Sequence, residues 1–364
     1  MSEWKEYKLG EIVSFGNGKE RPKEKGSIPV YGGNGILDYT DDSNYDGETV
    51  IIGRVGAYCG SVYYTNIPIW VSDNALAVKT KKGNDTKFIY YYLHHLNLND
   101  YAEGSSHPLV TQRLLNSIDV IIPTSLTEQK RIASILSSLD DKIDLLNREN
   151  ATLEAMAETL FRQWFIEEAK EDWEESTIEM YANHYKESIN PQKQPTTMFW
   201  HYSIPAFDNG KKPMDEMGEE IQSSKYIIPS NCILFSKLNP HKDKRIWLIL
   251  DNVPTNAICS TEFQIVKPKE TEFLYFLYGW LTNKENYEEI ASGVGGTSGS
   301  HQRIDPKSIF TFTCPYLDID VINKYNKIVE PLFLKQRENQ KQINTLTEQR
   351  DRLLPKLMSN EIKL

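Results

Sequence analysis

One stretch of the sequence, Glu128–Phe165, constrains the fold more than any other. It contains no Gly or Pro, and its apolar residues are spaced alternately four and three apart. They are Ile132, Leu136, Leu139, Ile143, Leu146, Leu153, Leu160 and Trp164, and Asn150 and Ala157 complete the series. A heptad pattern of this length is typical of a helix that packs along one partner helix. At roughly 1.5 Å per residue, such a helix is on the order of 57 Å long.

A second heptad series near the end of the chain predicts the partner helix, over Ile322–Leu357. Its positions are Tyr325, Val329, Leu332, Gln336, Asn339, Ile343, Leu346, Arg350, Leu353 and Leu357. Four positions of the predicted seam are polar: Asn150, Gln336, Asn339 and Arg350. Polar seam residues can fix the register of a helix pair at some cost in stability, or accept a partner protein. A looser pairing at these positions is the alternative, and the sequence leaves both open.

Each predicted helix follows a β-rich segment, and the two segments share an ordered set of features. Val50–Gly53 parallels Cys232–Ser236, Ser72–Lys79 parallels Ser260–Lys267, and Phe88–Leu93 parallels Phe273–Tyr278; Gly104–Arg113 parallels Gly299–Arg303, which puts Gln302 opposite Gln112. Self-similarity of this kind indicates an internal repeat. We therefore predict an α+β fold with two β-rich mixed domains, separated by two long helices that form an antiparallel coiled coil in a pseudo-twofold repeat.

The repeat sets the predicted boundaries. The first domain covers residues 1–125, the first helix 126–170, the second domain 171–316 and the second helix 317–364. In the second domain we predict a strand over Ser308–Cys314. We predict that residues 183–225 form a loop, because prolines interrupt that segment and it has little periodicity.

The charge balance alone argues against nucleic-acid binding, since the net charge is −10 and nucleic-acid-binding domains are usually basic. The charge is uneven, however, and local patches decide contact with phosphate. Between Lys225 and Arg245 the basic residues are Lys225, Lys237, Lys242, Lys244 and Arg245, against the single acid Asp243. The chain has no signal-like or membrane-spanning apolar run, which predicts a soluble, cytoplasmic protein. Its four widely spaced cysteines predict buried, reduced thiols.

Sequence motifs for catalysis are absent. There is no GxxxxGK[ST] phosphate loop, no HExxH, no GxSxG and no Asn-Pro-Pro-Tyr tetrapeptide of adenine methyltransferases. Adjacent His94 and His95 lie on a predicted helix, where neighbouring side chains face different directions. We expect no catalytic residues, no metal site and no cofactor bound by this chain.

The loops carry the residue types that read DNA. Arg, Lys, Asn, Gln and Ser suit base edges and phosphates, and two domains on a rigid spacer suit a ligand with two separated sites, such as double-stranded DNA. In the first domain the candidates are Tyr31, Asn34, Arg54, Tyr58, Ser105, Ser106 and Gln112; in the second they are Lys237, His241, Lys244, Arg245, Ser298, Ser300, His301 and Gln302. For each single residue, an ordinary solvated loop side chain is the alternative.

The ordered set of motifs resembles the specificity subunit of type I restriction-modification systems over nearly the whole chain. The segments that carry the resemblance are Ile121–Pro123 with Glu128–Ile132, Leu346–Ile362, Ile28–Gly33, Ile52–Gly56 and Leu234–Pro240. Two departures are Asn360, where many members have Gly, and Arg162–Phe165 at the end of the first helix. These departures concern surfaces for partners rather than the fold.

The resemblance implies a non-catalytic subunit whose target-recognition domains each read one half of a bipartite DNA sequence. It implies that the helix pair sets the unread spacer and docks two methyltransferase subunits, which bind S-adenosylmethionine. Motor-nuclease subunits would join for restriction. A fused methyltransferase would need a catalytic segment for which the repeat leaves no room. A coiled-coil adaptor that binds only proteins remains the alternative.

Overall fold

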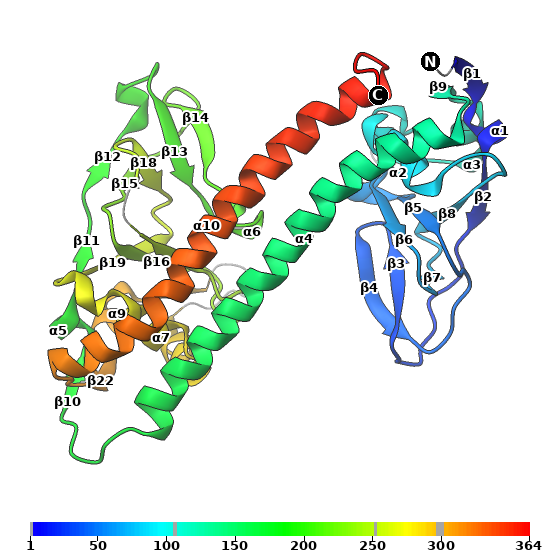
Figure 1. Ribbon diagram of the computed structural model, residues 1–364. Coiled ribbons are helices and arrows are strands. Elements are labelled where there is room, and N and C mark those ends of the chain that lie inside the picture. The colour runs from blue at the N-terminus through cyan, green and yellow to red at the C-terminus, as the bar shows by residue number, and fades with distance from the viewer. Residues whose placement is uncertain (1–2, 105–107, 251–252, 296–301) are drawn as a thin grey trace. The chain divides into compact units, whose positions relative to one another are not determined.

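The computed structural model describes residues 3–104, 108–250, 253–295 and 302–364, which form two compact units. Unit 1 comprises residues 1–148 and 339–364, and unit 2 comprises residues 149–338. The two predicted long helices are confirmed as α4 (Leu126–Arg162) and α10 (Ile319–Met358), and α4 continues as a π-helical turn, Gln163–Glu167. Each long helix contributes one part to each unit (Figure 1).

Unit 1 has a four-stranded sheet in the order β2-β8-β5-β6, a three-stranded sheet in the order β4-β3-β7, and a β1-β9 pair. The strands are β1 (Trp4–Lys8), β2 (Val13–Asn17), β3 (Ile28–Gly32), β4 (Gly35–Thr40), β5 (Thr49–Gly53), β6 (Val62–Thr65), β7 (Trp70–Val71), β8 (Ala75–Thr80) and β9 (Asp119–Pro123). The helices are α1 (Leu9–Ile12), α2 (Thr86–His95) and α3 (Gln112–Ser117), with 3-10 turns at Gly56–Tyr58 and Leu98–Tyr101.

Unit 2 has a four-stranded sheet, β11-β19-β16-β17, a five-stranded sheet, β12-β15-β18-β13-β14, and the pairs β10-β22 and β20-β21. The strands are β10 (Glu175–Thr177), β11 (Ala182–Tyr185), β12 (Ser188–Ile189), β13 (Met198–Tyr202), β14 (Met214–Met217), β15 (Lys225–Ile227), β16 (Cys232–Ser236), β17 (Ile246–Ile249), β18 (Ala257–Cys259), β19 (Phe263–Pro268), β20 (Val294–Gly295), β21 (Arg303–Ile304) and β22 (Thr313–Pro315). The helices are α5 (Ile178–Tyr181), α6 (Ile204–Asp208), α7 (Leu274–Thr282), α8 (Lys284–Ser292) and α9 (Pro306–Phe310), with 3-10 turns at Pro191–Lys193 and Thr271–Phe273.

The two units repeat one topology, which confirms the predicted α+β fold and its internal repeat. The sheets β2-β8-β5-β6 and β11-β19-β16-β17 have equivalent strand orders. In unit 1, β3 pairs antiparallel with β4 and parallel with β7, and in unit 2, β13 pairs antiparallel with β14 and parallel with β18. Strands β12 and β15 extend the second sheet of unit 2 and have no counterpart in the three-stranded sheet of unit 1.

Two local predictions were wrong, both in the second domain. Residues 183–225 do not form a loop, because they contain β12, the whole hairpin β13-β14 and α6. Two of the prolines that suggested a loop, Pro191 and Pro205, occupy first-turn helix positions, where the absent N–H costs little. The predicted strand Ser308–Cys314 is wrong in its first part, because residues 308–310 belong to α9, which follows the N-cap Asp305; the strand is limited to Thr313–Pro315.

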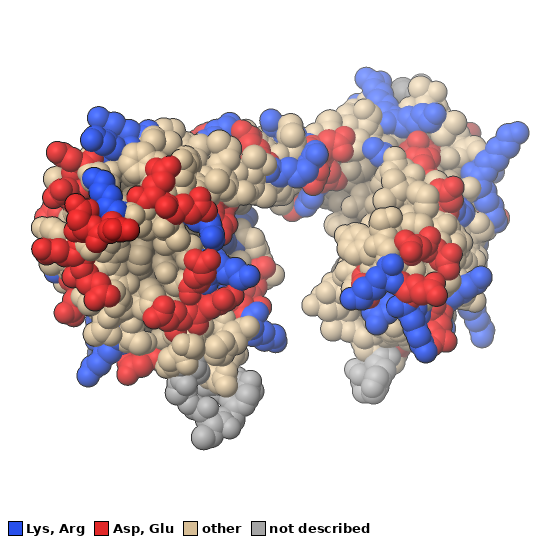
Figure 2. Space-filling view, turned by 90° about the horizontal axis from the view of Figure 1, so that it is seen from below, with Lys and Arg blue, Asp and Glu red and all other residues tan. Residues whose placement is uncertain are grey.

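Two of the five basic residues between Lys225 and Arg245 are not free at the surface, whereas Lys242 and Lys244 are exposed. Lys225 is 7% exposed and its ammonium group donates to the hydroxyl of Ser223 at 2.7 Å. The side chain of Arg245 is 11% exposed and is bound by Asp208 and Asp243 at 2.7 and 2.8 Å. Figure 2 shows Lys and Arg interspersed with Asp and Glu over the face drawn of each unit. Burial and ion pairing therefore remove part of the positive charge that the sequence suggested.

The domain of unit 1 shares its hydrophobic core with the long helices. Residues of α2, including Phe88 and Leu93, belong to the same buried cluster as Leu136 of α4 and Leu354 and Leu357 of α10. All five are less than 9% exposed. Burial of apolar area is the main favourable term in folding, so the helices form one wall of the domain's core.

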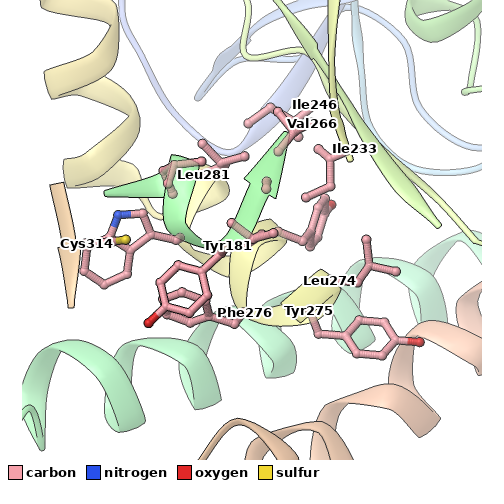
Figure 3. Close-up of a cluster of buried hydrophobic side chains, with 14 of the residues drawn as sticks. Tyr181, Ile233, Ile246, Val266, Leu274, Tyr275, Phe276, Leu281 and Cys314 are labelled. Atoms are coloured by element: carbon pink, nitrogen blue, oxygen red, sulfur yellow. The ribbon is translucent and has the colours of Figure 1, made fainter. Parts of the chain in front are cut away.

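Unit 2 is built in the same way, around aromatic side chains. Phe161 of α4 and Tyr325 of α10 have ring centroids 6.3 Å apart, and Phe161 also contacts Phe276 of α7 at 6.4 Å. A Cβ atom at Gly279 would lie 2.2 Å from the Phe161 ring, so α7 can approach α4 this closely only with glycine there. Figure 3 shows the part of this core around Tyr181 and Phe276, whose ring centroids are 5.3 Å apart.

The two helices run antiparallel in unit 2, since Glu154 contacts Gln336 while Phe161, later in α4, contacts the earlier Tyr325 in α10. None of the predicted seam residues is exposed. Ile132, Leu136, Leu146, Val329 and Ile343 are buried, and Leu139, Ile143, Asn150, Leu153, Leu160, Leu332, Leu346 and Leu353 are partly buried.

The polar seam residues make specific hydrogen bonds. Gln336 donates to the backbone oxygen of Asn150 and to the Glu154 carboxylate, both at 2.9 Å, and Arg350 donates to Asp140 at 2.8 Å. Of the two alternatives left open by the sequence, these contacts favour residues that fix the register.

The cysteines were predicted to be buried thiols. In the structure, Cys59, Cys232, Cys259 and Cys314 are free and buried. Burial raises the pKa of the Cys232 thiol to about 12, so this thiol stays protonated at neutral pH. Among the described residues, no helix is both long and apolar enough to cross a membrane.

The shared core of unit 1 predicts that Leu136→Ala lowers the free energy of unfolding by about 2–5 kcal/mol, because it leaves a cavity in a packed interior. Leu136 is 0% exposed, whereas Leu145 on the same helix is 49% exposed. Urea denaturation followed by circular dichroism measures the effect, with Leu145→Ala as the matched control. Equal losses in the two variants would contradict the shared core.

Candidate nucleic-acid interface

In unit 1, the segments that follow several strands meet beside the end of β5, and we call residues 33–34, 54–58, 72–74 and 108–112 loop cluster 1. Arg54 is at its centre. The Arg54 backbone N–H donates to the Asn74 oxygen at 2.9 Å, and the Val110 N–H donates to the Arg54 oxygen at 3.0 Å. A Cβ atom at Gly33 would lie 3.4 Å from the Val55 oxygen, so the β3-β4 turn lies against the same segment.

These bonds hold the Arg54 backbone on both sides. The Arg54 oxygen also accepts from the Cys59 thiol at 3.2 Å. The Nε atom of Arg54 is buried, and no hydrogen-bond partner for it occurs within the described part of the chain. A fixed backbone with an unsatisfied guanidinium nitrogen is an arrangement suited to a ligand with hydrogen-bond acceptors.

The other candidates of the first domain differ in how they are held. Gln112 donates to Asn17 at 2.8 Å, Tyr58 is 53% exposed, and Asn34 is exposed in the β3-β4 turn. Tyr31 is partly buried against Tyr63, with ring centroids 6.2 Å apart. Asn34, Arg54, Tyr58 and Gln112 all belong to loop cluster 1. Ser105 and Ser106 lie outside the described residues.

Unit 2 has a matching arrangement beside the end of β16, and we call residues 237–239, 260–262 and 302–304 loop cluster 2. The Lys237 N–H donates to the Glu262 oxygen and the Ile304 N–H donates to the Lys237 oxygen, both at 3.0 Å. The Asn239 N–H donates to the Gln302 oxygen at 2.9 Å. Arg303 binds the Glu262 carboxylate through two bonds of 3.0 and 2.8 Å.

The backbone bonds make Lys237 the structural equivalent of Arg54. Each residue directly follows the equivalent strand, and each carbonyl accepts from the last segment of its cluster, from Val110 in one and Ile304 in the other. The same comparison corrects the predicted pairing of Gln302 with Gln112. Gln302 occupies the place of Pro108, because Asn239 donates to Gln302 as Gly56 donates to Pro108.

Three other candidates of the second domain are described outside loop cluster 2. His241 is exposed. The Lys244 ammonium donates to the Thr282 oxygen at 2.7 Å, toward α7, and Arg245 is bound by Asp208 as noted above. These contacts argue for structural roles of Lys244 and Arg245, whose part in DNA binding stays a prediction. Ser298, Ser300 and His301 lie outside the described residues.

Sequence reasoning missed two amide side chains, one within loop cluster 1 and one beside it. Asn17 accepts the bond from Gln112, and Asn74 is exposed beside Arg54, whose N–H its carbonyl accepts. The sequence contains a signal for Asn17, because this residue stands between Gly16 and Gly18. A Cβ atom at Gly18 would overlap the Ser72 backbone, which explains why glycine is needed there.

Comparisons with known proteins show which sequences and which fold the chain resembles. Residues 1–155 match the family model described as the type I restriction modification DNA specificity domain. The predicted resemblance of the chain to type I specificity subunits is thereby confirmed, and the relatives below are named as specificity subunits.

The chain is 32% identical over 140 residues to the type I restriction enzyme EcoprrI specificity subunit of Escherichia coli, an alignment that covers 38% of this chain and 35% of that protein. It is 25% identical over 346 residues to the type I restriction enzyme MjaIX specificity subunit of Methanocaldococcus jannaschii, covering 84% of this chain and 76% of that protein. The chain thus spans about a third of the first relative and about three quarters of the second.

The fold is also that of a solved structure. The crystal structure of the type I restriction-modification system S subunit from M. genitalium aligns with a TM-score of 0.66 and 18% identity, over 98% of this chain and 96% of that one. At this identity the likeness concerns the fold alone. Among the described residues, no cluster of three or more His, Cys, Asp or Glu could hold a metal ion.

The electrostatics near loop cluster 2 involve His184 of β11. Its ring stacks on Phe310, with centroids 5.0 Å apart and planes 19° apart. Burial, followed by the charges of Lys186 and Lys237, lowers the pKa of His184 to about 4. The imidazole is therefore neutral in the folded protein at neutral pH, which avoids adding a further positive charge next to Lys237.

This shift predicts a loss of stability in mild acid. An unfolded histidine takes up its proton near pH 6.5, well before folded His184 does, so stability is fully present above pH 6.5 and falls as the pH drops toward about 4. His184→Gln should flatten this dependence. Urea midpoints at pH 7.5 and 5.0 measure it, with exposed His241→Gln as the control. A wild-type slope in His184→Gln would refute the assignment.

Proposed function

We propose that the chain is the DNA-recognition subunit of a type I restriction-modification complex, and that each domain reads one half of a bipartite sequence in double-stranded DNA. One observation carries the proposal. Loop clusters 1 and 2 place a cationic residue, Arg54 or Lys237, at the same backbone position in two domains of the same topology. The specificity subunits among its relatives support this reading.

The residue chemistry of the clusters suits DNA. Arg binds the O6 and N7 atoms of guanine through two parallel bonds, and amide side chains such as those of Asn34 and Gln112 pair with adenine or with phosphate. Lys binds phosphate as a point charge. Reading by loops on a rigid scaffold also explains how a chain with a net charge of −10 can bind DNA, because only the contacting face needs to be complementary.

In the same proposal the pair α4-α10 sets the unread spacer and docks two methyltransferase subunits. The outward faces of the helices carry exposed apolar side chains suited to such contacts: Leu145 and Met156 on α4, and Ile328 and Leu334 on α10. S-adenosylmethionine would bind in the methyltransferase subunits, and motor-nuclease subunits would join for restriction. The chain itself would contribute recognition and no chemistry.

Exchange of residues 1–125 for those of a related chain tests the proposal. We expect one half of the methylated sequence to change while the other half and the spacer stay the same. Sequencing of methylated adenines in cells that express the chain with its methyltransferase measures this, with the unmodified chain as reference. If no bipartite methylated sequence appears with the unmodified chain, the protein-only adaptor is the better description.

At the level of one residue, Arg54→Ala should weaken binding of the methyltransferase complex to its own target by about 1–3 kcal/mol, the value of one bidentate contact with guanine. Arg54→Lys should retain binding to unrelated DNA but lose part of the discrimination, because lysine lacks the planar fork. Fluorescence anisotropy at fixed salt measures both. Arg148→Ala, an exposed change on α4, is the control, and an equal loss there would contradict the assignment.

A further inference from the structure

A carboxylate on α4 joins the domain and the helix pair in unit 1. The Tyr91 hydroxyl of α2 donates to one oxygen of Asp140 at 2.6 Å, and Arg350 of α10 donates to the other oxygen at 2.8 Å. Tyr91 is 4% exposed, and the side chains of Asp140 and Arg350 are 28% and 27% exposed. Arg350 is itself held by Asp351 at 2.8 Å. Asp140 therefore contacts the domain and the opposite helix at once.

A second carboxylate on α4 does the same in unit 2. The Tyr278 hydroxyl of α7 donates to one oxygen of Glu154 at 2.8 Å, and Gln336 of α10 donates to the other oxygen at 2.9 Å. Tyr278 is 5% exposed. Helices α2 and α7 are the equivalent helices of the two domains, so the same kind of contact occurs in each unit although the participating positions differ.

These contacts supply a directional constraint that the shared cores lack. Apolar burial is non-directional, and a packed domain can rotate slightly over an apolar helix surface with little change in buried area. A hydrogen bond between a buried hydroxyl and a carboxylate is short and angle-dependent. A rotation or slide of the domain would break that bond and leave a buried polar group without its partner, which is costly.

We propose that Tyr91–Asp140–Arg350 and Tyr278–Glu154–Gln336 are positioning contacts that fix the orientation of each recognition domain on the helix pair, and thereby the spacing that the subunit accepts between half-sites. The inference rests on the proposed function and adds specific residues to it. None of these residues needs to touch DNA. They affect how strictly the subunit requires one spacing between the half-sites. The sequence of each half-site depends instead on the loop clusters.

Tyr91→Phe and Tyr278→Phe test the proposal, since each removes only a hydroxyl and keeps the ring in the core. Two tyrosines serve as matched controls. Tyr92, also in α2, accepts a bond from the Ile121 N–H at 2.9 Å, and Tyr287 donates to the Pro240 oxygen at 3.2 Å, so both hydroxyls bond within their own domain. All four variants are expressed as full chains with the methyltransferase subunit in a methylation-deficient host.

The measurement is the ratio of adenine methylation at genomic sites with the wild-type spacer to that at sites with a spacer one base pair longer or shorter. Loss of one hydrogen bond should lower this ratio roughly 2- to 10-fold in Tyr91→Phe and Tyr278→Phe. The half-site sequences should not change, and Tyr92→Phe and Tyr287→Phe should keep the wild-type ratio. In the Asp140→Asn background, Tyr91→Phe should lower the ratio by less than it does in the wild-type chain, because both changes affect the Tyr91–Asp140 contact.

The outcomes separate this inference from the proposed function. A wild-type chain that gives no bipartite methylated sequence would overturn the proposed function, and with it the basis for this inference. A bipartite sequence whose spacer ratio is unchanged in Tyr91→Phe and Tyr278→Phe would overturn the positioning role alone. An equal fall in all four variants would also overturn it, because general loss of stability would then explain the effect.

Discussion

The hydrophobic core that each domain shares with the long helices is the constraint on which the rest of the structure depends. Leu136 in unit 1 and Phe161 in unit 2 belong to α4, yet each is buried among residues of its domain. A domain that lacked the helices would expose one side of its core to water. Each long helix is therefore part of the folded core of the units to which it contributes residues, rather than a tether.

Burial alone leaves the details open, and smaller features specify them. Gly279 allows α7 to lie close against the Phe161 ring, and the polar seam residues bond specific positions of α4 and α10 to each other. Buried polar contacts of this kind contribute little net stability but strongly disfavour alternative registers, since any shift leaves polar groups unpaired. Packing thus determines that the elements associate, and the polar contacts determine how.

The sequence predicted what is periodic and missed what depends on partners far away in the chain. Heptad spacing identified both long helices to within a few residues, because helix period is a local property. The hairpin β13-β14 was missed although Phe199 and His201 alternate with exposed Met198 and Trp200, since five residues of alternation are outweighed by nearby prolines. Of the candidate site residues, four fall together in loop cluster 1. The hydrogen bond between Tyr91 and Asp140 could not be predicted, because only the folded structure brings these two residues together.

The equivalence of Arg54 and Lys237 distinguishes what the fold determines from what the side chain determines. Both clusters have the same backbone hydrogen bonds, so the position of the side chain is set by the fold, while its identity is free to differ. A guanidinium can form two parallel bonds to one base, whereas an ammonium group is a point charge that suits a phosphate oxygen. Under the proposed function, loop cluster 1 would use Arg54 for direct base contact, and loop cluster 2 would use Lys237 mainly for the backbone, leaving its base contacts to neighbouring side chains.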